Sequence, residues 1–67
     1  IMARVIRCVC YRKVHTFKKR KDAIEFFETA MMNSEGAERE RYFNLWEQLK
    51  TGRTFCYDYI EDAFNHQ

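Results

Sequence analysis

The sequence predicts a small α+β domain with the element order β-β-α-α-β. Two short segments rich in β-branched and aromatic residues open the chain, and two segments with apolar residues at helical spacing follow. A segment with alternating aromatic residues comes last. The natural two-layer arrangement of these elements is a three-stranded antiparallel sheet with a helical hairpin packed on one face. We expect the last strand to pair beside the first, within a single domain over residues 1–67.

The two opening strands are expected at residues 3–11 and at Val14–Phe17, with a tight turn at Arg12-Lys13 between them. Alternation places Cys8 and Cys10 on one face of the first strand. Apolar residues occur on both faces of this strand, so the pattern leaves open which face is buried. The turn lacks the Asn-Gly or Asp-Gly pair of a favourable two-residue hairpin, so the register stays open as well.

The period then changes to that of helices. The first helix is expected from about Lys19 to Asn33 and the second from about Ala37 to Lys50, because apolar residues recur every three or four positions in both. Ser34 and Gly36, in the turn between the helices, are the candidate caps of the second helix. Gly52 is placed to supply the left-handed residue that ends it.

The last strand is expected at Thr54–Ile60, and residues 61–67 are expected to form a loosely held tail. Eleven aromatic residues are more than so small a core can bury, and a chain of this length buries only about 60% of its unfolded surface. We therefore expect a homodimer, joined through the sheet edge or the aromatic face of the last strand. The predicted core contains Ile6, Ile24, Phe27, Met31, Tyr42, Leu45, Trp46, Leu49 and Phe55.

Cysteine and histidine residues are the first candidates for chemistry. Cys8 and Cys10, with Cys56 and the two histidines elsewhere, form only a weak ligand pattern, and small buried hydrophobes are the simpler interpretation. A cysteine nucleophile beside His15 would need a water-excluding pocket, for which a short chain leaves little room. We expect no metal, no cofactor and no enzymatic activity. Three cysteines and short uncharged stretches favour a cytoplasmic protein without membrane association.

Charge asymmetry is the strongest functional indication. Residues 1–21 hold eight bases and no acid, a net charge of +8, whereas the other 46 residues hold four bases and ten acids, a net charge of −6. Six of the bases fall in residues 12–21, here called the basic segment, where they could contact phosphates, with Tyr11 and His15 available to stack on bases. The alternative is a solvated charge run that maintains solubility. The cations of the basic segment are Arg12, Lys13, Lys18, Lys19, Arg20 and Lys21.

The aromatic residues of the last strand are the second candidate surface. Phe55, Tyr57 and Tyr59 alternate along it, and an edge strand offers unpaired backbone groups to a partner. The simpler interpretation is that Phe55 and Tyr57 complete the core. The sequence thus favours a small nucleic-acid-binding or regulatory protein. The alternative is a protein-binding accessory factor, such as an inhibitor of a host-defence enzyme, that uses exposed aromatic residues and charge asymmetry.

Three stretches carry a family resemblance that spans most of the chain: residues 23–27, residues 34–42 and residues 49–52. They resemble short uncharacterised proteins of bacterial phages and mobile elements, notably in Firmicutes. The resemblance concerns helix and turn features and transfers no catalytic residue. It implies that the chain acts as a regulator, a nucleic-acid binder or an inhibitor of host defence of the anti-CRISPR kind.

Overall fold

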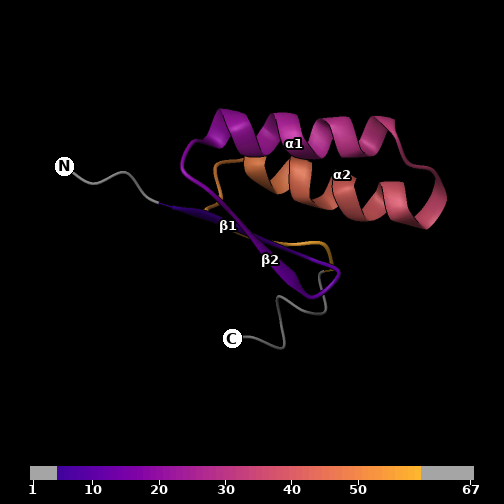
Figure 1. Ribbon diagram of the computed structural model, residues 1–67, viewed down its shortest axis with the longest axis horizontal. Coiled ribbons are helices and arrows are strands. Elements are labelled where there is room, and N and C mark those ends of the chain that lie inside the picture. The colour runs from indigo at the N-terminus through magenta and orange to yellow at the C-terminus, as the bar shows by residue number, and fades with distance from the viewer. Residues whose placement is uncertain (1–4, 60–67) are drawn as a thin grey trace.

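A computed structural model describes residues 5–59 and contains three strands and two helices in the predicted order. The strands are β1 (Ile6–Cys10), β2 (Lys13–Phe17) and β3 (Phe55–Tyr57), and the helices are α1 (Arg20–Met32) and α2 (Gly36–Lys50). Both helices lie on the same side of the strands, which gives two layers (Figure 1). The α+β class and the helical hairpin on one face of the sheet are therefore confirmed. The expected tail at residues 61–67 lies outside the described residues.

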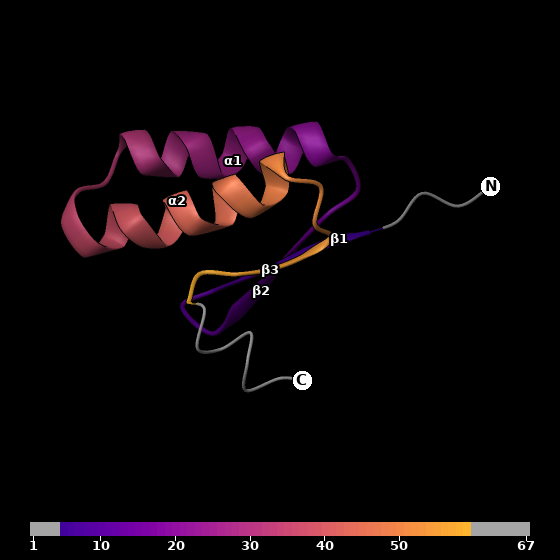
Figure 2. The ribbon, with the colours of Figure 1, turned by 180° about the vertical axis from the view of Figure 1, so that it is seen from behind.

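The sheet has the strand order β2-β1-β3, so β1 is central, and Figure 2 shows β3 beside it. The prediction that the last strand pairs beside the first is confirmed. The prediction of a fully antiparallel sheet is wrong, because β3 runs parallel to β1, with Cys56 opposite Cys8. The reason lies in the connections: β1 and β2 form an antiparallel hairpin, and α1, α2 and β3 each reverse the chain again. After four reversals the chain runs in its original direction.

The hairpin turn lies one residue earlier than predicted. β1 ends at Cys10 and β2 begins at Lys13, so Tyr11 and Arg12 form the two-residue loop. Both loop residues have positive φ, 52° at Tyr11 and 66° at Arg12, as a type I′ turn requires. Residues with large side chains seldom adopt positive φ, so a tyrosine and an arginine at these positions do not predict this turn. The Tyr11 N–H donates to Asp58 Oδ2 at 3.0 Å, which holds the turn from outside the hairpin.

The helices end close to their predicted bounds, but their caps differ. Neither Ser34 nor Gly36 caps α2: Glu35 is its N-cap residue without a side-chain hydrogen bond, and the Ser34 hydroxyl instead donates to Ala30 O in α1. The carboxyl end of α2 follows the prediction. Gly52 has φ 100°, and its N–H donates to Leu49 O while the next N–H reaches Gln48 O, the pattern of a Schellman motif.

The core lies between the sheet and the helices and resolves the question of which face of β1 is buried. The inward face carries the cysteines, and Cys56 of β3 joins them. Phe55 was expected in the core but is 44% exposed, because it alternates with the inward-facing Cys56. Ile24, Tyr42 and Trp46 pack at the margin of the core as partly buried residues, and Met31 is partly buried. The buried cluster consists of Ile6, Cys8, Cys10, Ala23, Phe27, Leu45, Leu49 and Cys56.

Candidate nucleic-acid interface

The fold separates the basic segment into two groups of cations at opposite ends of β2. Arg12 and Lys13 lie at the hairpin turn. Lys18, Lys19 and Lys21 lie where β2 leads into α1 (Figure 1). All five side chains are exposed. Extended chain joins the two groups, so about 17 Å separates Lys13 from Lys18 at a rise of roughly 3.3 Å per residue.

These five cations form no ion pair within residues 5–59. The ion pair that the structure forms there joins Arg41 to Asp58, and none of the five cations takes part in one. The edge between the two groups is also open, because β2 pairs with β1 alone among the described strands. Cys10 and Lys13 flank the two-residue turn and form a hydrogen-bonded pair. Because such pairs alternate with non-hydrogen-bonded pairs along an antiparallel hairpin, the backbone groups of Val14 and Thr16 point away from β1. The open edge of β2 therefore presents backbone donors between two positive groups.

Arg20, the sixth cation of the basic segment, has a structural role. Its Nη1 donates to Leu49 O at 2.9 Å and to Arg53 O at 2.8 Å, and its Nη2 donates to Gly52 O at 3.0 Å. These carbonyls lie at and just beyond the end of α2, where backbone acceptors lack intrahelical partners. The guanidinium of Arg20 thus links the start of α1 to the end of α2. Its role differs from that of the five exposed cations.

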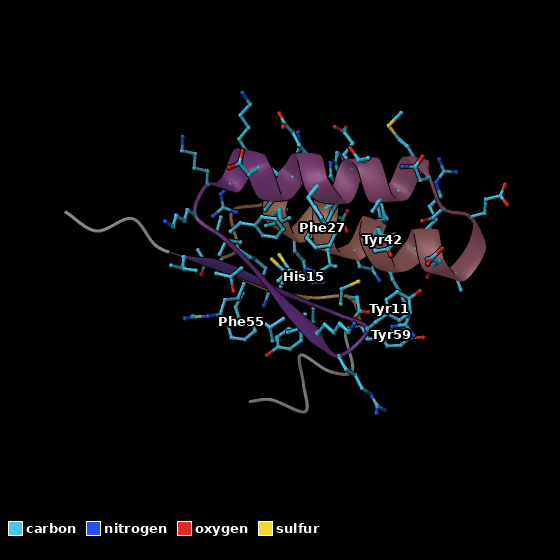
Figure 3. The ribbon with its side chains drawn as sticks, viewed as in Figure 1. Tyr11, His15, Phe27, Tyr42, Phe55 and Tyr59 are labelled. Carbon is cyan, nitrogen blue, oxygen red and sulfur yellow. The ribbon has the colours of Figure 1, made fainter. Side chains whose placement is uncertain are left out.

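The two aromatic candidates for base stacking lie in different environments. His15 is half-buried between the layers, with its ring 5.7 Å from the Phe26 ring and 6.1 Å from the Phe27 ring (Figure 3). Tyr11 is 46% exposed at the hairpin turn. Figure 3 places Tyr59 next to it, at the end of the molecule where Arg12 lies. Of the two predicted rings, Tyr11 is the accessible one.

A polar cluster beside the hairpin turn was missed by sequence reasoning. Arg41 of α2 lies with its Cζ 4.5 Å from the ring centroid of Tyr11 and 3.8 Å from that of Tyr59. Its Nη1 donates to Asp58 Oδ2 at 2.8 Å, and Asp58 is completely buried. The hydrogen bond to Asp58 raises the pKa of Arg41, so the guanidinium stays charged. A signal existed: alternation along the last strand places Asp58 on the same face as the buried Cys56.

The edge of β3, proposed for partner binding, is largely covered by α2. Gln48 Nε2 donates to Tyr57 O at 2.7 Å, and Gln48 Oε1 accepts from Tyr57 N–H at 3.2 Å. Asn44 Nδ2 donates to Asp58 O at 3.0 Å. The side chains of α2 thus occupy the backbone groups of Tyr57 and the carbonyl of Asp58, which an added strand would need. The sequence carried a faint signal, since Gln48 continues the spacing of the buried Leu45.

The aromatic side chains of β3 lie apart from this edge. Phe55 and Tyr57 stack with their ring centroids 5.1 Å apart. Figure 3 shows Phe55 on the side of the sheet that faces away from the helices. Phe55 is 44% exposed and Tyr59 is 48% exposed, whereas Tyr57 is buried. The structure therefore brings Phe55 and Tyr57 together on the outer sheet face and places Tyr59 in the Arg41 cluster instead.

The three cysteines are buried, free thiols on the inward side of the sheet. A hydrogen bond with Cys56 and burial raise the pKa of Cys8, and burial raises the pKa of Cys10 to about 11. The same contact with Cys8 lowers the pKa of Cys56, whose side chain is completely buried. The raised pKa of Cys8 and Cys10 is the opposite of what an activated nucleophile requires, and the Cys56 thiol, with its lowered pKa, is completely buried. Within residues 5–59, no three histidine, cysteine or acidic residues are arranged to hold a metal ion.

Comparisons with protein-family models, with curated proteins and with solved structures gave no match. Neither helix among the described residues is long and apolar enough to cross a membrane.

Proposed function

We propose that this chain is a small, non-enzymatic protein that binds nucleic acid through the exposed cations of the basic segment. One observation carries the proposal: Arg12 and Lys13 at one end of β2, and Lys18, Lys19 and Lys21 at the other, are exposed and without ion pairs within residues 5–59. Phosphate contacts of this kind supply most of the affinity of sequence-independent binding.

The surroundings of these cations support the same proposal. The two groups lie about 17 Å apart along an extended strand, which lets the protein surface follow several successive phosphates. Between them, the N–H groups of Val14 and Thr16 point outward and can donate to phosphate oxygens, as backbone amides do in many complexes. Arg20 contributes charge near this surface but is held by carbonyl groups at the end of α2.

Fluorescence anisotropy with a labelled 12-nucleotide strand at low salt tests the proposal. Replacing Lys18, Lys19 and Lys21 together by alanine should weaken binding at least tenfold, because three phosphate contacts are lost. The matched control replaces Arg39 and Lys50, exposed cations of α2 outside the basic segment, by alanine and should leave the affinity nearly unchanged. Equal effects of the two variants, or no binding by the unmodified protein, would rule out the proposed surface.

A second candidate function is self-association or protein binding through the outer face of the sheet. The observation that favours it is a group of exposed apolar side chains, with Val5 40%, Val14 59% and Phe55 44% exposed. Edge-to-edge pairing is disfavoured at both edges: Gln48 occupies the Tyr57 backbone at β3, and two β2 edges would bring like charges together. A homodimer would therefore join sheet faces, which pack about 10 Å apart in sandwiches.

Sedimentation at low micromolar concentration distinguishes this candidate. A dimer that Phe55→Ser converts to monomers, without loss of oligonucleotide binding, would support face-to-face association. A monomer of 8.2 kDa that also retains oligonucleotide binding leaves nucleic-acid contact as the function and excludes the dimer.

A further inference from the structure

A small hollow beside the hairpin turn has the chemistry of a site for one unpaired base. It has a volume of about 230 Å³ and is lined by Tyr11, Arg12, Arg41 and Tyr59. This volume is below the roughly 300–1,000 Å³ of sites for drug-sized ligands, so the hollow suits a single ring system. Among residues 5–59, its lining contains two guanidinium groups, two phenol rings and no carboxylate. Two larger hollows, beside α1 and at the turn between the helices, both have acidic lining residues.

The cluster is held in place before any ligand arrives. The guanidinium of Arg41 lies between two rings, 4.5 Å from the Tyr11 centroid and 3.8 Å from the Tyr59 centroid. Asp58 Oδ2 accepts from both Arg41 Nη1 and the Tyr11 N–H, and this buried carboxylate therefore orients both groups. Tyr11 also meets the Tyr42 ring edge-on, with centroids 6.4 Å apart. Rings that are fixed in this way lose little conformational freedom when a base stacks on them.

Both outer tyrosines remain accessible, since Tyr11 is 46% and Tyr59 is 48% exposed. Figure 3 shows them side by side at the end of the molecule that carries the hairpin turn. Arg12 lines the same hollow, and Lys13 follows directly in the chain. A strand whose phosphates run along the cations of β2 would thus bring a base to aromatic rings at one end of its path.

We infer that the Tyr11, Arg12, Arg41 and Tyr59 hollow receives one unpaired base of a single strand, an inference that rests on the proposed nucleic-acid binding. A base in the interior of a duplex keeps both faces stacked on its neighbours, so a single strand offers many more bases to the hollow than a duplex does. Stacking on protein rings tolerates any base, because every base has a π-face. The protein should accordingly prefer single strands over duplexes while showing little dependence on sequence.

The experiment compares three labelled ligands of 12 nucleotides: an oligothymidine, a strand of the same length made of abasic sugar phosphates, and a duplex. The unmodified protein should bind the oligothymidine at least fivefold more tightly than the abasic strand, since one stacked base is worth about 5–150-fold. Tyr59→Leu should remove most of this preference and leave the salt dependence unchanged. Tyr59→Phe, which keeps the ring, should retain the preference.

The lysine variant distinguishes base binding in the hollow from phosphate binding along β2. Replacing Lys18, Lys19 and Lys21 by alanine should weaken binding of all three ligands by a similar factor and preserve the ratio between oligothymidine and abasic strand. Equal affinity of the unmodified protein for both single strands would overturn the base site while leaving phosphate binding intact. No binding of any ligand would overturn both. The comparison of ligands on the unmodified protein remains decisive even where Tyr59→Leu unfolds the chain.

Discussion

Gln48 offers the most direct test of how α2 and the sheet are joined. Its side-chain amide bonds both backbone groups of Tyr57, with distances of 2.7 and 3.2 Å, and its Nε2 also reaches Asn44 O at 2.9 Å. Gln48→Ala removes the two bonds to Tyr57 and leaves a N–H and a carbonyl at a buried residue without this partner. Each bond contributes about 0.5–1.5 kcal/mol net, and the loss of this partner at a buried residue adds to the cost. We expect Gln48→Ala to reduce the free energy of unfolding by about 2–3 kcal/mol.

Urea unfolding followed by Trp46 fluorescence measures this free energy, and thermal melting provides a second readout. For a domain of this size, each 1 kcal/mol corresponds to roughly 4–8 °C in Tm, so the loss should lower Tm by about 10–20 °C. Glu47→Ala is the matched control, because Glu47 is the neighbouring, exposed residue of the same helix. This control should change stability by less than about 0.5 kcal/mol. If the two variants lose the same stability, the amide of Gln48 does not hold β3.

Three further predictions concern the groups that connect the layers. Arg20→Ala should lower stability by about 1–2 kcal/mol, and Arg20→Lys should recover little of it, because three carbonyls need the planar guanidinium; urea unfolding of both variants checks this. Asp58→Ala should destabilise at least as much as Gln48→Ala in the same assay, since it frees the turn and leaves Arg41 without its acceptor. Burial raises the pKa of Cys10 above its ordinary value of 9.0 to about 11, so the folded state favours the protonated thiol. The stability that this thiol contributes is complete below pH 9 and is lost between about pH 9 and 11, as the pH rises through the folded-state pKa. Stability measured across that range should fall less steeply in Cys10→Ala; parallel curves would contradict the raised pKa.

The periodic parts of the chain determined what the sequence could predict. Helical spacing placed α1 and α2 to within one or two residues, and alternation correctly paired Cys8 with Cys10 on one face. The direction of β3 was missed although the predicted element order contains the same four reversals, because the prediction assumed an antiparallel sheet and did not count them. The turn at Tyr11-Arg12 was missed because tertiary contacts, including the bond to Asp58, replace the usual glycine or asparagine.

The candidate site could also be predicted only in part from the sequence. Exposed cations can be located from sequence because a run of bases without acids has few ways to be buried, and five of the six are exposed. Arg20 differs from its neighbours only through contacts with Leu49 and the residues after it, which lie about thirty positions away. The grouping of Arg41 with Tyr11 and Tyr59 depends on β3 running beside β1 in the parallel direction. No local pattern reports that arrangement.

The salt dependence of oligonucleotide binding tests the central claim most directly. Five phosphate contacts from Arg12, Lys13, Lys18, Lys19 and Lys21 predict a slope of log K against log salt of about −3.5 for a single strand, at roughly −0.7 per contact. Replacing the three lysines by alanine should reduce the slope to about −1.4. A binding constant that does not change between low and physiological salt, or a slope that the lysine variant shares with the unmodified protein, would contradict the assignment of this surface.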